Sequence, residues 1–489
     1  MREVLLPASS PGLLEGIVPA ARLDQLVDRM AQELREGMAG RSIININTAE
    51  VGGGVAEMLR VLLPYTRGAG IDARWFVLDG DPEFFEITKR LHHRLHGRVG
   101  DGGPLGPHEA AKLAEIADMN ASGLRGDVVA GDVVVIHDPQ PAALLPLMSE
   151  WGVHTIWRCH IGTDAPNEWS MQAWEFLRPF LEGRVDAYVF TRKEYAPAWI
   201  PNELLRVIRP SIDPVAPKNQ DMSQEVALDV MRHVGLVNGQ APDVVPFMRS
   251  DGSPGRIGHY ADVIRTGPPP EADAPMVVQV SRWDPLKDMA GVMHAFADYI
   301  LDGTDAHLVL AGPVVTSVAD DPEAAEVLNQ VWREWSALPH SARSRVQLVC
   351  LPMVDPDENA AIVNALQRHA TVVVQKSLEE GFGLTVTEAM YKGRAMVASN
   401  IGGIPDQITD RVNGLLVSDP TDLEAFGALV SELLNQPELR ADLGKHARES
   451  VIEGFLPDTS LTRWGEVITM VLKGGDNGGS ADVAGPSTS

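Results

Sequence analysis

The sequence of 489 residues has only two cysteines, Cys159 and Cys350, which excludes a fold built on a framework of disulfides. Both stand in apolar, strand-like surroundings, so we expect buried thiols in a reducing compartment and a cytoplasmic protein. No uninterrupted apolar run reaches the roughly 18 residues that a membrane-spanning helix needs. The first residues, MREVLLPASSPG, show no secretory signal.

Positive charge is also scarce. Lys and Arg total 41 against 67 Asp and Glu, which gives a formal net charge of −26. Such a chain repels nucleic acid and anionic membranes over most of its surface, so we expect neither as a partner. A site for phosphate must therefore be a local basic pocket that works against the general field of the protein.

Several motifs of known chemistry are missing. The sequence contains no P-loop, no HExxH helix and no G-x-S-x-G nucleophile elbow. Two D-x-D matches, at 79–81 and 355–357, fit loop or helix-cap positions, and the adjacent His92 and His93 lack a metal-binding spacing. We therefore expect no metal site and no cofactor, and nothing in the sequence makes Mg²⁺ a requirement.

Strand-like apolar runs alternate with helical patterns along both halves of the chain. The runs of the first half are 41–47, 73–78, 132–137, 153–158, 186–190 and 205–209. Those of the second half are 276–281, 307–312, 346–351, 371–375, 395–399 and 414–418. This alternation predicts an α/β fold with two Rossmann-like, doubly wound domains that face each other across a cleft, with ligands at the carboxyl ends of the strands.

The same patterns predict the domain boundaries. We expect an N-terminal domain at 1–218, a linker or insertion at 219–275 and a C-terminal domain at 276–455. The linker is rich in proline and glycine and has room for one helix at 223–234. A last helix at 456–473 is expected to pack back on the N-terminal domain, and the small, polar tail at 474–489 to be disordered.

The strongest candidate site follows the strand-like run at 371–375. Gly381 and Gly383 precede a helix that is predicted to begin near Leu384, and the free backbone amides of a helix start suit phosphate or sugar oxygens. Glu380 and Glu388 flank this turn, a pattern suited to hydroxyl binding at one end and charge stabilisation at the other. The competing interpretation is an ordinary surface turn with two glutamates.

Two other loops also follow strand-like runs. Arg282 and Lys287 lie where the chain leaves the run at 276–281, and two cations there suit a diphosphate. A solvated arginine and a lysine on a helix face fit the spacing equally well. The glycines at 52–54, which include Gly53 and Gly54, suit an anion at a helix start or a simple tight turn, and they do not form a G-x-G-x-x-G fingerprint.

Polar residues end two of the runs in the first half. His160 follows the run at 153–158 and is placed to meet a sugar hydroxyl, although a lone histidine is more often a structural residue. Asp138 follows the run at 132–137, on the same side of the predicted sheet as His160, and it also fits the cap of the next helix.

Taken together, these residues resemble the retaining glycosyltransferases of the glycogen-synthase-like group, glycosyltransferase family 4, which have the two-Rossmann GT-B fold. Glu380 and Glu388 match the E-x7-E signature of that group, and Arg282 with Lys287 matches its donor-phosphate pair. Further segments narrow the resemblance to the trehalose glycosyltransferring synthases, over about residues 40–455: GGGVAEML, VVVIHDPQP, WRCHI, SRWDPLKD and EEGFGLTVTEAMYKGR.

This resemblance implies a reaction and a set of roles. The implied enzyme transfers glucose from ADP- or UDP-glucose to free glucose with retention and without a metal. The implied catalytic residues are His160, Glu380, Arg282 and Lys287. Donor-binding roles fall on Gly53, Gly54, Gly381, Phe382, Gly383, Leu384, Glu388 and Met353, and acceptor-binding roles on Asp138 and Asp164. The expected partners are thus a sugar nucleotide and glucose, and we expect a homodimer.

One departure from the family concerns the acceptor side. Relatives continue the His-Ile pair with an aspartate, whereas this chain has Gly162 there and its nearest acid is Asp164. Three alternatives therefore stay open. The enzyme could be a trehalose phosphorylase, since the related phosphorylases share much of the pattern, or a transferase with another small acceptor. The third alternative is a regulator that binds a sugar nucleotide without turnover.

Overall fold

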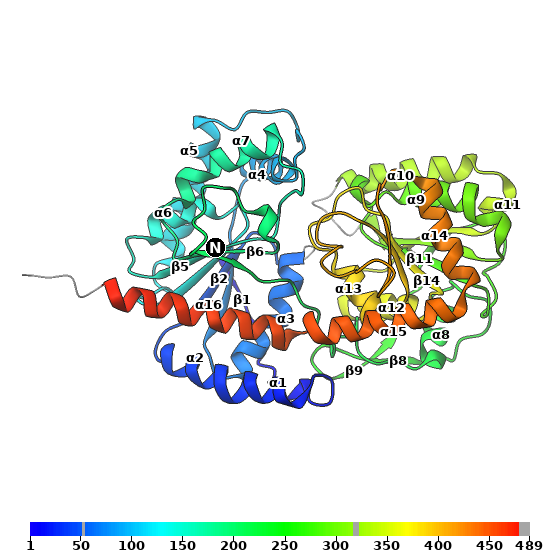
Figure 1. The fold of residues 1–489 in the computed structure, drawn as a ribbon, viewed down its shortest axis with the longest axis horizontal. Helices are drawn as coiled ribbons and strands as arrows, with labels where there is room; N and C mark the ends of the chain where they lie inside the picture. Colours follow the sequence, from blue (N-terminus) through cyan, green and yellow to red (C-terminus); the bar gives the residue numbers. More distant parts are fainter. Residues whose placement is uncertain (51–53, 316–321, 479–489) are drawn as a thin grey trace, which may run out of the picture. The chain divides into compact units, whose positions relative to one another are not determined.

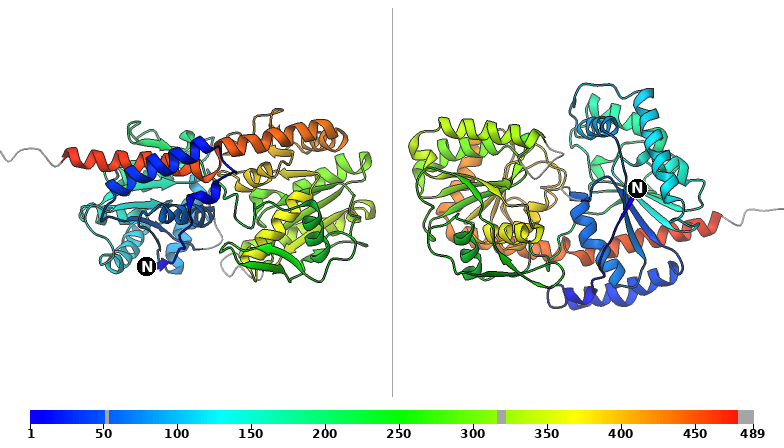
Figure 2. Two further views of the ribbon diagram at one scale, coloured as in Figure 1. Left: turned by 90° about the horizontal axis from the view of Figure 1, so that it is seen from below. Right: turned by 180° about the vertical axis from the view of Figure 1, so that it is seen from behind.

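The computed structural model describes residues 1–50, 54–315 and 322–478, which form two compact units (Figures 1 and 2). Unit 1 contains Met1–Ser211 together with the chain from Pro457 onward, and unit 2 contains Ile212–Leu456. The chain therefore changes units after Ser211 and after Leu456, and the boundary expected at 218 lies inside unit 2. In the described part of the chain, no helix has the length and apolarity needed to span a membrane.

Unit 1 is built on a seven-stranded sheet in the order β1-β3-β2-β4-β5-β6-β7. Its strands are β1 (Arg2–Val4), β2 (Ile43–Asn47), β3 (Ala73–Val77), β4 (Val133–His137), β5 (His154–Cys159), β6 (Ala187–Phe190) and β7 (Leu205–Val207). Only β1 is antiparallel to its neighbour, β3. The order reverses between β2 and β4, and in doubly wound sheets such a switch point is where ligands bind.

Helices cover both faces of this sheet. One face packs against α4 (Pro82–Leu95), α5 (Pro107–Leu124), α6 (Leu145–Met148) and α7 (Glu168–Leu181). The other face carries α1 (Ala20–Asp24), the π-helical turn η2 (Gln25–Met30), α2 (Ala31–Gly37), α3 (Gly54–Gly68) and α16 (Pro457–Gly478). Burial on both faces explains why the strands read as nearly continuous apolar runs.

The C-terminal helix α16 is part of the core of unit 1. Val467, Ile468 and Val471 share one apolar cluster with Leu34 of α2 and Val133 of β4. Helix α16, red in Figure 2, packs against α2 and η2. The helix ends at Gly478, so residues 474–478 are helical and not a disordered tail, and the rest of the expected tail lies outside the described residues.

Unit 2 repeats the doubly wound plan with the strand order β10-β13-β12-β11-β14-β15-β16. Its strands are β10 (Asp262–Ile264), β11 (Met276–Val280), β12 (His307–Pro313), β13 (Val346–Leu351), β14 (Val372–Gln375), β15 (Met396–Ser399) and β16 (Leu415–Val417). Its longer helices are α8 (Gln224–His233), α9 (Met289–Ala295), α10 (Pro322–Ala337), α12 (Pro356–His369), α13 (Leu384–Tyr391), α14 (Leu423–Asn435) and α15 (Pro437–Gly454). Here the switch point lies between β11 and β14.

Short helical turns complete the two units. In unit 1 they are η1 (Pro11–Leu14), η3 (Ala142–Leu144) and η4 (Lys193–Tyr195). In unit 2 they are η5 (Pro285–Lys287), η6 (Phe296–Ile300), η7 (Leu301–Gly303) and α11 (His340–Arg343).

The segment expected as a linker, 219–275, belongs to unit 2. It contains α8, close to the predicted helix, and also the hairpin of β8 (Val245–Met248) and β9 (Pro254–Ile257). Strand β10 then adds to the edge of the main sheet by pairing antiparallel with β13. The linker prediction was wrong because these strands are short and interrupted by proline and glycine, so they lack the apolar runs of the central strands.

Candidate functional site

In unit 2, the loops after β11 and β14 leave the sheet side by side at the switch point. Three contacts tie them together. The amide of Leu378 donates to the carbonyl of Leu286 over 2.7 Å. The buried Gln279 donates through Nε2 to the carbonyl of Lys287 over 2.6 Å and accepts from the amide of Lys376 over 3.2 Å. The two loops therefore form one connected platform.

Lys287 and Glu380 meet on this platform. Lys287 Nζ lies 2.7 Å from Glu380 Oε2, and Ser377 Oγ donates to the same oxygen over 3.2 Å. Both ionic side chains are mostly covered, with 16% and 10% of their surface exposed, respectively. The structure thus brings together two of the four implied catalytic residues, and Lys287 is held by Glu380 and mostly covered, which does not fit the alternative of a lysine on an open helix face.

Arg282 differs from Lys287. Its side chain is 59% exposed and pairs with Asp284 over 3.2 Å, so as it lies here it fits the solvated interpretation. A guanidinium at this exposed position is the side chain that can turn toward an incoming anion, since it gives up only a weak surface ion pair. Its donor-phosphate role stays a prediction.

A second cation under the platform was missed by the sequence reasoning. Lys376 is fully buried and forms an ion pair with Asp288, which has a left-handed backbone with a φ of 45°. Asp288 also caps α9 by accepting from the amide of Gly291 over 3.1 Å. Lys376 follows β14 directly, so the strand-end logic that found Glu380 also pointed to it.

The glycine turn leads into α13 as predicted. Gly383 has a φ of 85° and precedes Leu384, the first residue of the helix. Phe382 is buried against Phe455, with ring centroids 5.9 Å apart, so its side chain belongs to the core and only its backbone is available to a ligand. Left-handed Gly383 turns the chain so that the first amides of α13 stay unpaired by the helix.

The turn is also held from the next loop. The amide of Gly403 donates to the carbonyl of Gly381 over 3.1 Å, and Gln407 Nε2 donates to the carbonyl of Phe382 over 2.5 Å. A Cβ at Gly403 would lie 2.6 Å from the Cα of Phe382, so only glycine permits this close approach. Gly403 and Gln407 lie between β15 and β16, and no pattern in the sequence indicated this supporting role.

Glu388 lies in the second turn of α13 and is 3% exposed. Its Oε1 is 3.4 Å from Nζ of Lys218. The buried Lys392 donates to the carbonyl of Glu388 over 3.1 Å and to Gln367 Oε1 over 2.8 Å. Burial lowers the pKa of Lys392 to about 7. Met353, the remaining donor-side candidate of unit 2, lies half-buried in the loop after β13.

In unit 1, Asp138 and His160 meet at the ends of β4 and β5. Asp138 Oδ1 accepts from the backbone amide of His160 over 2.7 Å, and the amide of Asp138 donates to the carbonyl of Arg158 over 2.7 Å. The alternative role of Asp138 as a helix cap is therefore wrong, because its carboxyl joins two strand ends. Burial raises the pKa of Asp138 to about 7, against the smaller opposing effects of the His160 amide and Arg158.

A second histidine packs against His160. The rings of His137 and His160 stack at 11° with centroids 5.7 Å apart, and His137 Nδ1 lies 3.4 Å from His160 Nε2. His137 Nε2 lies 3.0 Å from Asn45 Oδ1. Burial, together with the nearby Arg158, lowers the pKa of His137 to about 3 and lowers the pKa of His160 well below its usual range. Both imidazoles are thus neutral at physiological pH.

The acceptor-side candidate Asp164 does not join this group. It is exposed and forms an ion pair with Arg192. Gly162 lies directly against Tyr195, and a Cβ at position 162 would overlap the tyrosine ring. An aspartate at this position, as the family pattern expects, would therefore require Tyr195 to move.

The remaining residues singled out in the sequence lie outside the two groups described above. Gly54 is the first residue of α3, whereas Gly53 lies outside the described residues. Asp81 and Asp355 cap α4 and α12, as expected for their D-x-D matches. Among the residues that the structure describes, no three His, Cys, Asp or Glu side chains cluster closely enough to hold a metal ion. Cys159 and Cys350 are free and buried.

Two Rossmann-like units, with a lysine–glutamate pair and a glycine-capped helix at the switch point of the second, define a glycosyltransferase with the GT-B fold. Residues 45–197 match the model of the trehalose synthase N-terminal domain, and residues 262–450 match the model of glycosyl transferases group 1. A trehalose synthase of Pyrococcus horikoshii is 32% identical over 446 residues, which cover 89% of this chain and 92% of the relative. The chain belongs to the trehalose synthase family.

Other relatives place the chain within a wider group. A trehalose synthase of Rubrobacter xylanophilus is 33% identical and covers 87% of this chain and 89% of its own length. A trehalose phosphorylase of Pleurotus sajor-caju is 25% identical, and the match covers 87% of this chain but only 57% of the phosphorylase. A solved trehalose-6-phosphate synthase shares the fold with a TM-score of 0.64 at 12% identity, covering 87% of this chain and 98% of that one.

Proposed function

We propose that the protein is a retaining glucosyltransferase that makes trehalose from a nucleoside diphosphate glucose and free glucose without a metal ion. The observation that carries the proposal is the Lys287–Glu380 pair beside the start of α13, at the switch point of unit 2. The family membership supports the choice of sugar.

In this proposal, unit 2 binds the sugar nucleotide donor. Lys287, joined by Arg282, stabilises the negative charge that develops on the leaving diphosphate, a task that a metal ion performs in other transferases. Glu380 and the amides around Gly383 hold the donor glucose, and Glu388 binds the ribose hydroxyls. Lysine suits this role because its ammonium is a compact point charge on a flexible stem.

The proposal gives unit 1 the acceptor side of the reaction. His160 contacts the sugar and helps to stabilise the oxocarbenium-like transition state, while the acceptor hydroxyl loses its proton to the departing phosphate. The carboxylates near His160 are poor nucleophiles, since Asp138 accepts from the His160 amide and Asp164 pairs with Arg192. This favours attack from the side of the leaving group over the double displacement of retaining glycosidases.

Trehalose phosphorolysis is the second candidate, and the phosphorylase relative favours it. Against it, the chain matches only 57% of the length of that phosphorylase but almost the full length of the synthases. The two reactions differ in the group at the phosphate site, which is inorganic phosphate in one and a nucleotide in the other.

Three parallel incubations test the proposal. The first contains glucose with ADP-, UDP- or GDP-glucose, the second trehalose with phosphate, and the third maltose alone. We expect trehalose in the first, unchanged in rate by EDTA. Glucose 1-phosphate in the second alone would establish the phosphorylase, trehalose in the third alone an isomerase, and no turnover in any with tight donor binding a regulator. A screen of sugar phosphates and glycerate in the first incubation tests the acceptor.

A further inference from the structure

We infer that Asn45 and His137 are positioning residues that fix the tautomer of His160. The chain of contacts runs from Asn45 on β2 through His137 at the end of β4 to His160 after β5, across the switch point of unit 1. The consequence for catalysis rests on the proposed function, whereas the tautomer itself does not.

The contacts assign each ring proton in turn. Asn45 Oδ1 can only accept, so His137 Nε2, 3.0 Å away, carries a proton and donates it. The neutral His137 ring then has a bare Nδ1, which can only accept. His160 Nε2, 3.4 Å from that atom, must therefore carry a proton, and Nδ1 of His160 is left as an acceptor.

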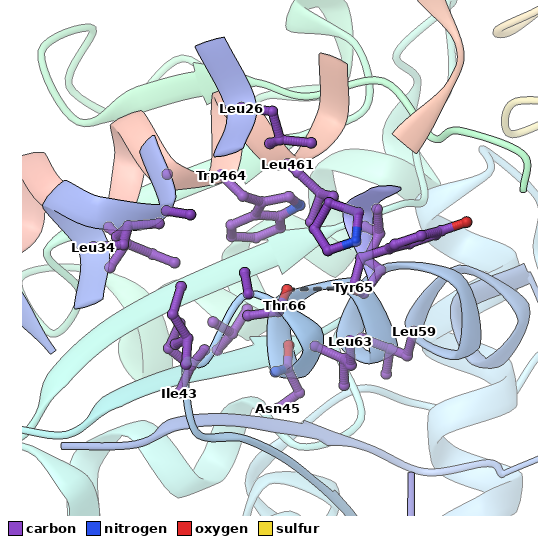
Figure 3. Close-up of a pocket in the computed structure, with 18 of the residues that line it drawn as sticks. Leu26, Leu34, Ile43, Asn45, Leu59, Leu63, Tyr65, Thr66, Leu461 and Trp464 are labelled. Carbon is purple, nitrogen blue, oxygen red and sulfur yellow. Dashed lines mark hydrogen bonds between the residues drawn. The ribbon is translucent and has the colours of Figure 1, made fainter. Parts of the chain in front are cut away.

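The surroundings leave His137 few alternative partners. His137 is 1% exposed and Asn45 is 4% exposed, so competition from bulk water is excluded. Both residues line a cavity of about 60 Å³ whose walls are otherwise mainly apolar. Figure 3 shows Asn45 between the side chains of Ile43 and Leu63 in this cavity. In this arrangement Asn45 directs Oδ1 at His137, while its buried Nδ2 has no partner among the described residues, so the proton assignment depends on this orientation of the Asn45 amide.

The assigned tautomer determines which atom of His160 can contact a sugar. His160 keeps part of its surface exposed, and its backbone is held by Asp138 Oδ1 over 2.7 Å. With Nε2–H directed to His137, the Nδ1 lone pair is the side of the ring that accepts a hydrogen from a sugar hydroxyl. A protonated Nδ1 would present a donor instead and would repel the hydroxyl hydrogen.

The direct test is ¹⁵N NMR of histidine-labelled protein, with the His160 signals identified by their loss in His160→Gln. We expect the shifts of neutral Nε2–H imidazole for His160 in the unmodified chain. An Nδ1–H signature, or a mixture of both, would overturn the inference without any activity measurement. This readout does not depend on turnover, so it stays informative if the chain makes no trehalose.

Two pairs of variants extend the test. His137→Phe keeps an aromatic ring but removes the acceptor, and Asn45→Leu keeps the volume but removes the anchor, so in both we expect a mixed His160 tautomer. In both, kcat falls at least about tenfold while the donor KM changes less than about twofold, as for other residues that orient a reacting side chain.

The matched controls keep the contacts. Asn45→Gln retains a neutral amide acceptor for His137 Nε2, with the adjoining cavity to take the extra methylene, and we expect it to preserve the tautomer and most of kcat. His108→Gln removes an exposed histidine that pairs with Glu83 and should change neither readout. A fall in kcat for His137→Phe with an unchanged His160 tautomer would show that His137 acts only through packing, which contradicts the inference.

Discussion

The switch points of the two units differ in the charge of the residues that form them. In unit 2 the residues are ionic, with Lys287 on Glu380, Lys376 on Asp288 and Lys218 beside Glu388. In unit 1 the residues around His160 are held by hydrogen bonds between neutral groups, and burial keeps His137 and His160 uncharged. The same topology thus provides one ionic switch point and one with uncharged buried histidines, a difference that fits the proposed donor and acceptor sides.

The largest expected effect concerns the ionic site. Lys287→Ala removes the cation nearest Glu380, and we expect kcat/KM to fall by about 10² to 10³, the usual loss for one electrostatic contact to a transition state. Glu380→Gln should lose most activity as well. Initial rates with each nucleoside diphosphate glucose measure both, and circular dichroism checks the fold. Lys445→Ala, on an exposed helix face, is the control. Near-normal rates in both site variants would remove the donor assignment.

The next effect concerns the backbone that supports the ionic site. In Gly403→Ala the new Cβ meets the Cα of Phe382, and because backbone cannot yield easily we expect a loss of about 1 to 3 kcal/mol in the free energy of unfolding. Urea denaturation measures this loss. Gly454→Ala, whose Cβ meets nothing within 4 Å, should unfold like the unmodified chain. Equal stabilities would show that the turn at 381–383 is free to adjust.

The buried groups beside His160, Asp138 and His137, should make the stability of the protein depend on pH. Burial raises the pKa of Asp138 to about 7, so its contribution to stability is present below pH 3.8 and is lost as the pH rises to 7. The pKa of His137 is lowered to about 3, so its contribution is present above pH 6.5 and is lost as the pH falls. Between pH 4 and 6.5 the two slopes therefore oppose each other.

Single variants separate these slopes. Asp138→Asn should make stability rise more steeply with pH than in the unmodified chain, and His137→Phe less steeply, by about 1.4 kcal/mol per pH unit in each case. Both are measured by denaturant titration at pH 4, 5 and 6. Parallel curves for all three proteins would mean that neither group is held away from its ordinary pKa, which would contradict the neutral character of this site.

The smallest expected effect concerns Lys218. Its ammonium is 3.4 Å from Glu388 Oε1 and partly exposed, so we expect Lys218→Met to raise the donor KM by a few-fold, about 1 kcal/mol or less, and to leave kcat unchanged. Kinetics at two salt concentrations measure this, because the effect should shrink at high salt. Lys218→Arg serves as the matched control. A fall in kcat would place Lys218 in the chemical step.

The sequence was most informative where burial shapes the pattern. Each of the twelve strand-like runs contains a strand, because a parallel strand covered on both faces is apolar throughout. Four strands escaped prediction: β1, β8, β9 and β10 are three or four residues long and carry charged or exposed positions. Their existence depends on neighbours that are distant in the chain.

At the site, the residues that follow strand ends could be predicted from the sequence, whereas the residues that hold them in place could not. Lys287 and Glu380 were found because they follow the two strands of a switch point. Asn45 and His137 lie within buried strands, where a polar residue looks like any core residue until its partner across the sheet is known. Asp138 was assigned correctly to the neighbourhood of His160, but its bond to a strand end, and not to a helix, required the fold.

Helix α16 has a consequence for dissecting the molecule. Unit 2 is a single stretch of chain, Ile212–Leu456, and can be excised as one fragment, whereas unit 1 is completed only after unit 2 has been synthesised. A truncation at Ser211 would strip Val467, Ile468 and Val471 from the core and leave an apolar sheet face open to aggregation. During translation, the first half must therefore wait for the last helix before it can close its core.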